Sequence, residues 1–148
     1  MIEAAVVDAS VGVKWVVNET DSDVARSLSQ TSLHAPDLFP IECANILWKK
    51  ARLRDLTRRN AMECLDILQQ APVAIVPTHE LMPRALDLAF ELQHPVHDCV
   101  YLALALLRGI PLVTADERLV KAARKVRKTS DKVILLSQIR VRRPSLPS

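Results

Sequence analysis

The sequence opens with MIEAAVVDAS (residues 1–10), an apolar, β-branched run that ends at Asp8 and is followed by Ala9 and Ser10. This pattern predicts a strand that stops at Asp8 and turns directly into a helix. Three later runs are also short, apolar and bounded by proline or polar residues, which is typical of strands buried on both faces. They are residues 73–76, 112–114 and 133–136. A further short strand is expected near residues 33–35.

Helical spacing fills the intervals between these strands. Apolar residues recur at steps of three and four from Leu81 to Leu92, and another apolar stripe opposes basic residues over residues 119–128. Residues 22–70 form a long helical region, interrupted near residues 34–36 and again near residues 55–57. Strands that alternate with helices in this way predict an α/β fold with a parallel sheet.

The composition fits one compact domain. A chain of 148 residues with 49% apolar residues can bury a single core, and we assign residues 1–139 to one domain and residues 140–148 to a basic, proline-containing tail. The N-terminus has no basic stretch ahead of an apolar segment, and no apolar run is long enough to cross a bilayer. We therefore expect a soluble, cytoplasmic protein without membrane partners.

Residue types argue against several classes of site. The three cysteines, Cys43, Cys64 and Cys99, are odd in number and far apart, which argues against a disulfide framework or a zinc site and favours buried thiols. With only Gly12 and Gly109, the chain has neither a G-x-G-x-x-G fingerprint nor a P-loop, so we expect no nucleotide cofactor.

Basic residues are unevenly distributed, although the net charge is only +3. Residues 1–48 contain seven acidic residues against Lys14 and Arg26, whereas basic residues cluster within residues 49–59, 121–128 and 140–143. Clusters of this kind either contact phosphate groups or form solvated helix faces, and the sequence leaves both interpretations open.

Asp8 and Asp116 each follow a predicted strand. Ligands of an open parallel sheet bind beyond the carboxyl ends of its strands, so both acids are expected at the functional edge. Asp8 closes the first strand, with Ser10 two residues later, and Asp116 follows residues 112–115 before a helix begins. The alternative is that each acid only caps the helix that follows it.

Asp98 and Glu42 belong to predicted helices. Asp98 precedes residues 99–107, which are apolar all round and predict a buried helix whose N-terminus Asp98 marks, as a site residue or as a cap. Glu42 begins a polar stripe beside the predicted inward face of its helix. The alternative interpretation is that Glu42 is an ordinary solvated side chain. The predicted inward residues are Ile41, Ala44, Trp48 and Ala51. The polar stripe is Glu42, Asn45, Lys49 and Arg52.

These four acids together predict metal chemistry. Carboxylate oxygens select hard cations such as Mg2+ or Mn2+, whereas zinc would recruit cysteine or histidine. Four carboxylates packed together without a cation would repel one another, and some would take up protons. A bound divalent ion resolves that conflict.

The pair His94-x-x-His97 directly precedes Asp98 and offers a second interpretation of this region. Its spacing suits one face of a helix, but Pro95 breaks the helix and no further His or Cys completes a zinc set. We therefore do not assign the two histidines as a metal or acid–base pair, and we expect His97 to pack or cap beside Asp98.

These residues carry a resemblance to the PIN-domain ribonucleases, and the chain is most similar to the VapC-like toxins of toxin–antitoxin pairs. The resemblance spans essentially the whole chain, and its motifs occur in the family's order. They are Val6–Val11 followed by Lys14-Trp15, then Glu42–Leu47, then Asp98–Ala103, then Thr114–Asp116. Four ordered motifs are far more specific than any one of them.

The resemblance implies a PIN-like three-layer fold, with a central, mainly parallel sheet of four to five strands flanked by helices. It also implies metal-dependent cleavage of single-stranded RNA, homodimerisation and inhibition by a small cognate antitoxin. Metal ligation is carried over onto Asp8, Asp98 and Asp116, and Glu42 becomes a ligand or the base that orients the attacking water. All four acids are thereby candidate catalytic residues. The supporting polar groups would be Ser10, Asn45 and Thr114.

With RNA as the substrate, the basic clusters are candidates for binding its phosphate groups. We assign Lys49, Arg52, Lys121 and Arg124 as candidate contacts to the RNA backbone. Aromatic residues are only 3% of the chain and mostly lie in apolar segments, so backbone electrostatics rather than base stacking is the expected mode of binding.

Two other functions compete with this one. Asp8 at a strand end is also where an aspartate-based phosphatase or phosphotransfer domain would carry its nucleophile, but Asp8-x-Ser10 lacks the second acid that such a phosphatase has two residues on. The other rival is a non-catalytic PIN-like scaffold that binds RNA. The presence of all four acids counts against that scaffold.

Overall fold

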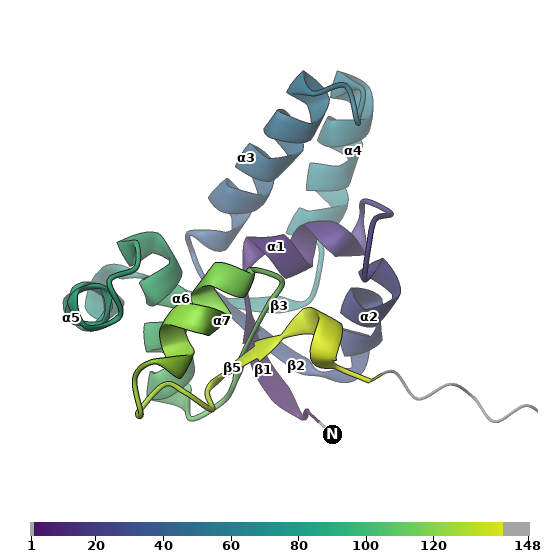
Figure 1. The fold of residues 1–148 in the computed structure, drawn as a ribbon. Coiled ribbons are helices and arrows are strands. Elements are labelled where there is room, and N and C mark those ends of the chain that lie inside the picture. The colour runs from purple at the N-terminus through teal and green to yellow at the C-terminus, as the bar shows by residue number, and fades with distance from the viewer. Residues whose placement is uncertain (1, 141–148) are drawn as a thin grey trace, which may run out of the picture.

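A five-stranded parallel sheet forms the centre of the protein (Figure 1). The structure is a computed structural model and describes residues 2–140. The strands are β1 (Ala4–Val7), β2 (Ser32–Pro36), β3 (Val73–Val76), β4 (Leu112–Thr114) and β5 (Val133–Leu135). They lie in the order β3-β2-β1-β4-β5, and all four pairings are parallel. The predicted α/β fold is confirmed, including the short strand expected near residues 33–35.

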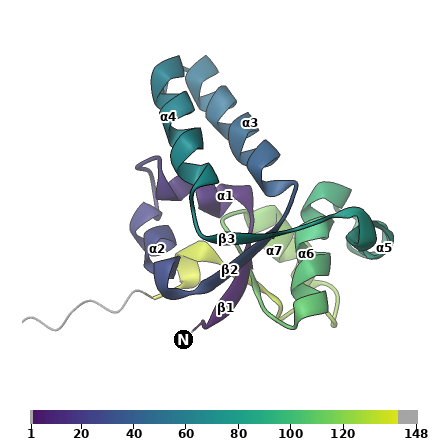
Figure 2. The same cartoon turned by 180° about the vertical axis from the view of Figure 1, so that it is seen from behind.

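Helices cover both faces of this sheet (Figures 1 and 2). The α-helices of residues 2–140 are α1 (Ala9–Gly12), α2 (Ser22–Ser27), α3 (Phe39–Arg52), α4 (Arg58–Gln69), α5 (Met82–Leu92), α6 (Val96–Arg108) and α7 (Glu117–Arg124). The chain moves from β1 through β2 to β3 in one direction along the sheet, then returns past β1 to β4 and β5. Because such crossovers are right-handed, α1 to α4 fall on one face and α5 to α7 on the other.

The core lies where α6 crosses the central strands. All three residues of β4 are buried, as are Ala5 to Val7 of β1 and every residue of α6 from Cys99 to Ala105. Helix α6 contacts β1, β2 and β4 on one side and α5 on the other. Contact on both sides explains why this segment is apolar all round, and it confirms the predicted buried helix.

The α3–α4 hairpin projects beyond the carboxyl edge of the sheet (Figure 1). The chain leaves the helical conformation between Arg52 and Arg58, close to the predicted interruption at residues 55–57. The predicted inward face of α3 is wrong, because Ile41 and Trp48 are 69% and 56% exposed. Helix α3 instead packs its Cys43 and Leu47 side inward, since its contacts are with α1 and α4 and its opposite side is uncovered.

Strand β3 is a second correction to the sequence analysis. It was expected to be buried on both faces, but its two central residues, Ala74 and Ile75, are exposed. The reason is its position: β3 is an edge strand that pairs only with β2. The four-residue apolar run therefore identified a strand correctly but not its place in the sheet.

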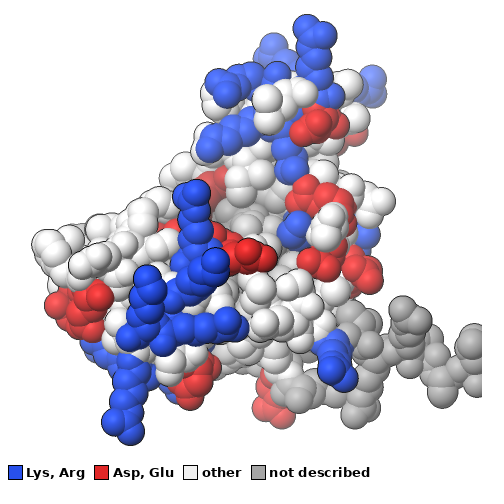
Figure 3. Space-filling view, in the orientation of Figure 1, with Lys and Arg blue, Asp and Glu red and all other residues white. Residues whose placement is uncertain are grey.

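Positive charge gathers in two places on the face seen in Figure 3, at the free end of the α3–α4 hairpin and over α7. Apart from Arg140, the basic tail expected at residues 140–148 lies outside the described residues. Within residues 2–140, no helix combines the length and the apolar character that crossing a bilayer requires.

Candidate metal centre

The carboxyl ends of β1 and β4 lie side by side at the point where the chain reverses its direction along the sheet. Helices leave these two neighbouring strands on opposite faces, which opens a crevice between them. Asp8 follows β1 directly, and Asp116 follows β4 by two residues. The two acids are thus placed at the same edge by topology alone.

Both acids also cap the helices that follow them. Asp8 accepts a hydrogen bond from the backbone N–H of Val11 at 3.3 Å, and Asp116 accepts one from the backbone N–H of Arg118 at 2.9 Å. The capping alternative is therefore correct as a description of geometry. It does not compete with a site, because an N-cap carboxylate keeps further lone pairs free for other partners.

A hydroxyl network ties Asp8 to the end of β4. The hydroxyl groups of Ser10 and Thr114 donate to the two carboxylate oxygens of Asp8. Thr114 Oγ1 accepts the backbone N–H of Asp116 at 3.0 Å, and Ser10 Oγ accepts the backbone N–H of Ala115 at 3.0 Å. Asp8, only 5% exposed, is therefore fixed in orientation relative to Asp116.

The pKa of Asp8 is raised to about 6, mainly by burial and in smaller part by the nearby charge of Asp98. The hydroxyl donors Ser10 and Thr114 and the backbone N–H of Val11 act in the opposite direction. Burial also raises the pKa of Glu42, and Asp98 again adds to the effect. The charge of Asp98 therefore acts on both of the other carboxylates.

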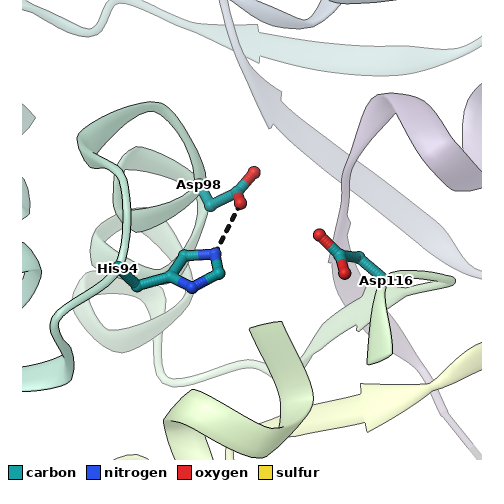
Figure 4. A group of neighbouring side chains, drawn as sticks. All are labelled: His94, Asp98 and Asp116. Carbon is teal, nitrogen blue, oxygen red and sulfur yellow. Dashed lines mark hydrogen bonds and ion pairs between the residues drawn. The ribbon is translucent and has the colours of Figure 1, made fainter. Parts of the chain in front are cut away.

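His94, Asp98 and Asp116 form the tightest part of this region (Figure 4). One potential ligand atom from each of the three lies within 4.8 Å of the others. His94 Nε2 is 2.6 Å from Asp98 Oδ2, and the His94 side chain is only 11% exposed. Figure 4 shows Asp98 at the start of α6 and Asp116 ahead of α7, with their carboxylates facing one another across a gap.

The structure corrects the interpretation of the two histidines. His94, which was set aside, contacts Asp98 closely, whereas His97 is 57% exposed and its Nε2 lies 3.6 Å from Asp98 Oδ1. Pro95 does break the helix, but the break is what places His94: Gln93 ends α5 in the left-handed region at φ 51°, and the chain then turns back toward α6. The spacing from His94 to Asp98 was a usable signal that the proline obscured.

Asp98 itself lies inside α6 rather than ahead of it. The N-cap position belongs to Pro95, which makes no side-chain cap hydrogen bond, and Asp98 is in the first turn. The expectation that Asp98 caps the helix is therefore wrong in detail, because α6 begins at Val96. A first-turn carboxylate is still stabilised by the helix dipole.

Glu42 reaches the site from the first turn of α3. Its Oε2 accepts a hydrogen bond from the phenol of Tyr101 at 2.9 Å, and Tyr101 is fully buried in α6. Burial and the charge of Glu42 raise the pKa of Tyr101 well above its usual range, so the phenol remains a donor. Gly12 allows this approach of α3 to α1, because a Cβ there would lie 2.6 Å from the Phe39 ring. Tyr101 could not be recognised from the sequence, because it lies in an apolar run and resembles the core residues around it.

The remaining predicted residues divide between the site and the surface. Ser10 and Thr114 belong to the network around Asp8, whereas Asn45 is exposed and has no side-chain hydrogen bond within residues 2–140. Lys49 and Arg52 are exposed on α3, and the Arg52 guanidinium lies 5.1 Å from the centre of the Trp48 ring. Lys121 and Arg124 are exposed on α7.

The cysteines do not provide an alternative chemistry. Cys43 and Cys99 are buried, and burial raises their pKa values to about 12 and about 11, respectively, so both thiols stay protonated. Cys64 is partly buried. An apolar pocket of about 220 Å3 between α3, α4 and β3 contains Cys43 but none of the four acids. The chemistry of the described residues is therefore concentrated at the carboxylates.

The donor set fits a divalent metal ion. Asp8, Asp98 and Asp116 offer carboxylate oxygens at one edge of the sheet, and Asp8 and Glu42 have raised pKa values that a cation would lower again. Oxygen-rich sites suit Mg2+ and Mn2+, and an imidazole nitrogen such as that of His94 is also tolerated by Mn2+.

Residues 5–125 match the model of the family described as "PIN domain". The chain belongs to the PIN-domain family. The matched range contains all four acids, together with His94 and Tyr101. Nucleases of this family use divalent metal ions, which agrees with the donor set of the site.

Curated and solved relatives agree with this assignment. The PIN domain is 34% identical over 122 residues to Ribonuclease VapC3 of Mycobacterium tuberculosis, an alignment that covers 81% of this chain and 88% of the relative. It is similar to the crystal structure of PAE2754 from Pyrobaculum aerophilum, with a TM-score of 0.65, 25% identity and coverage of 82% and 79% of the two chains. A toxin–antitoxin complex from Klebsiella pneumoniae shares the fold at a TM-score of 0.63 and 14% identity, with coverage of 91% and 99%.

Proposed function

We propose that this PIN domain is a Mg2+- or Mn2+-dependent endoribonuclease that cleaves single-stranded RNA and acts as the toxin of a toxin–antitoxin pair. The observation that supports it most is the cluster of His94, Asp98 and Asp116, at the edge of a PIN-family sheet where Asp8 follows the neighbouring strand β1. Relatives named as VapC ribonucleases, 34% identical over most of the chain, support the choice of RNA as substrate.

Asp8, Asp98 and Asp116 would hold the ion. When bound, the divalent ion supplies charge neutralisation at the phosphoryl oxygens and activates water for attack on phosphorus. Asp8 is held by Ser10 and Thr114, and Asp116 is held by its bond to the Arg118 backbone. These bonds fix both carboxylates before any ligand arrives, which reduces the reorganisation that binding requires.

Glu42 is assigned as the group that orients the attacking water and accepts its proton. Beside a bound cation the Glu42 carboxylate is ionised, so it can accept that proton. Tyr101 occupies one carboxylate oxygen of Glu42 and leaves the other free for water. A water nucleophile does not need the ribose 2′-hydroxyl, so the products would carry no cyclic phosphate.

His94 is assigned as a positioning residue for Asp98. Its Nε2 lies 2.6 Å from Asp98 Oδ2, and this bond restricts rotation of the carboxylate that faces Asp116. Partners of this kind, one bond removed from the metal, commonly orient the ligand and contribute to metal affinity.

The phosphatase alternative fits the geometry less well. An aspartyl nucleophile must present a carboxylate oxygen to the phosphoryl group. In this chain the residue two positions after Asp8 is Ser10, whose hydroxyl donates to Asp8, and not the second acid that such a phosphatase uses. Hydrolysis of p-nitrophenyl phosphate without any cleavage of RNA would favour the phosphatase.

The test is cleavage of an end-labelled single-stranded RNA in Mg2+, in Mn2+ and in EDTA. The parent protein is expected to cut the RNA only with a divalent ion, and Asp8→Asn and Asp98→Asn are expected to abolish cutting. Asp66→Asn, an exposed carboxylate on α4, is the matched control and should cut at the parent rate. Parent-level cutting by either site variant would overturn the proposal.

We further propose a cognate antitoxin and a homodimer as partners. Support comes from the VapC relatives and from the toxin–antitoxin complex that shares this fold. Large apolar side chains are exposed outside the core, among them Ile41, Met62 and Phe90, and these are available for contacts with a partner. Light scattering of the purified protein tests the dimer, and a monomer at all concentrations would contradict it.

A further inference from the structure

A groove of about 520 Å3 lies between the α5–α6 connection and α7. Its wall on one side includes Glu91 and His94, and on the other side Arg118, Lys121 and Lys125. Figure 3 shows the corresponding concentration of Lys and Arg over α7. The groove lining contains no Phe, Tyr or Trp, so it offers mainly charge rather than a broad stacking surface.

The groove is continuous with the candidate metal centre. His94 is part of its wall and also lies 2.6 Å from Asp98. Arg118 is part of the opposite wall, and its backbone N–H donates to Asp116 at 2.9 Å. One end of the groove is therefore formed by residues that contact the carboxylates on both sides. A ligand lying in the groove would reach the site directly.

The basic residues of the groove are available for a ligand. Arg118, Lys121 and Lys125 are spaced by three and four residues, so they share one face of α7 and its C-cap, while Leu119 and Ala123 face the core. None of the three forms an ion pair within residues 2–140. The one acid of the lining, Glu91, is already paired with Lys128 at 2.7 Å.

The α3–α4 hairpin carries the competing basic cluster, and its charges are partly engaged. Lys50 lies 2.6 Å from Glu19, Arg59 lies 3.3 Å from Glu63, and Arg52 lies over Trp48. No residue of this hairpin contributes to the groove lining. The described charges thus favour α7 over the hairpin as the surface next to the site.

We propose that this groove binds the sugar-phosphate backbone of the RNA strand next to the bond that is cut. Arg118, Lys121 and Lys125 contact successive phosphates over a length of about 10 Å, the rise of seven helical residues. The proposal rests on the proposed ribonuclease function. It also predicts little base selectivity from the groove itself, because charged side chains that contact phosphates carry no sequence information.

The experiment measures binding of a fluorescent single-stranded RNA by anisotropy, in EDTA to prevent cutting, over a series of salt concentrations. The triple variant Arg118→Gln, Lys121→Gln, Lys125→Gln is compared with the parent protein. Three lost phosphate contacts should lower the slope of log K against log salt by about 2, since each contact to a single strand contributes about 0.7. With Mg2+ present, the KM for RNA should rise about tenfold or more at low salt, while kcat changes little.

A control of equal charge separates a groove from general electrostatics. Arg84, Arg108 and Lys132 are exposed and absent from the groove lining, and Lys132 directly precedes β5, at the edge of the sheet opposite the site. Their triple change to Gln should alter the RNA affinity less than threefold. Circular dichroism and thermal melting of each variant confirm that it is folded.

Each outcome of this comparison bears on the groove, on the ribonuclease function or on both. Equal loss of RNA binding in the groove and control variants would overturn the proposal that the groove binds RNA. A loss confined to a double variant on the hairpin, Lys49→Gln with Arg52→Gln, would also overturn it. If the parent protein cuts RNA but the groove variant binds RNA normally, the proposed role of the groove is wrong and the ribonuclease function still stands. A parent that neither binds nor cuts RNA would contradict both.

Discussion

The phenol of Tyr101 donates a hydrogen bond to Oε2 of Glu42 at 2.9 Å, which joins the buried helix α6 to the first turn of α3. Asp98 lies three residues before Tyr101 on the same helix. One helix therefore supplies a candidate metal ligand and also the group that holds the candidate base. The position of Glu42 depends on α6 as much as on α3.

Replacing Tyr101 with Phe tests this relationship. The ring stays buried, but Glu42 loses the donor that orients it, and a hydrogen bond to a charged group contributes about 1.5–3 kcal/mol. We expect kcat for RNA cleavage to fall about tenfold or more, with little change in KM. Thermal melting serves as the control for folding. A folded Tyr101→Phe protein with the parent kcat would contradict the role given to this bond.

Thr114 is the link between Asp8 and Asp116, because its hydroxyl donates to one and accepts from the backbone of the other. Thr114→Val keeps the shape of this fully buried side chain and removes both bonds. We expect the free energy of unfolding to fall by about 1–3 kcal/mol, measured by urea denaturation. Thr114→Ser retains the hydroxyl and should lose clearly less. A Thr114→Val protein as stable as the parent would contradict the role given to the hydroxyl.

His94 should affect metal binding more than its neighbour His97. His94→Ala removes the partner of Asp98, and we expect the affinity for Mn2+ to fall about tenfold, as for other residues that orient a metal ligand. His94→Gln can still donate to Asp98 and should recover part of the loss. His97→Ala is the matched control, since that side chain is mostly exposed. Calorimetry with Mn2+ gives the comparison, and equal effects of His94→Ala and His97→Ala would contradict it.

The buried carboxyl of Asp8 should make the metal-free protein less stable as the pH rises. Its pKa is raised from 3.8 to about 6 by burial, so folding favours the protonated form. The associated stability is present below pH 4 and is lost as the pH rises through 6, by at most about 3 kcal/mol. In EDTA, Asp8→Asn should therefore gain stability relative to the parent between pH 4 and pH 7. A difference between the two proteins that stays constant over this range would contradict the prediction.

The positions of the two acids that follow strands could be predicted from the sequence. Asp8 and Asp116 could be placed because parallel strands end at one edge, and that edge is independent of side-chain packing. The order of the strands placed β1 beside β4, and this detail came only from the structure. The strand containing residues 73–76 was recognised, but its edge position was not, since periodicity does not report neighbours.

The helical residues were harder to place, for physical reasons. Helix α3 packs on one side only, and its exposed side carries Ile41 and Trp48, so hydrophobicity pointed to the wrong face. Tyr101 was hidden within an apolar run, where only a structure shows that its phenol meets Glu42. His94 was set aside because Pro95 breaks the helix, yet the turn around that proline brings its imidazole to Asp98.

The central claim is that the acids after β1, in α6 and in the loop after β4 gather to bind one divalent cation. Titration of the metal-free protein with Mn2+, followed by loss of the free-ion electron paramagnetic resonance signal, measures this directly. The account predicts saturable binding that Asp98→Asn and Asp8→Asn each weaken at least tenfold, with Asp66→Asn unchanged. Binding of equal strength in all four proteins would contradict it.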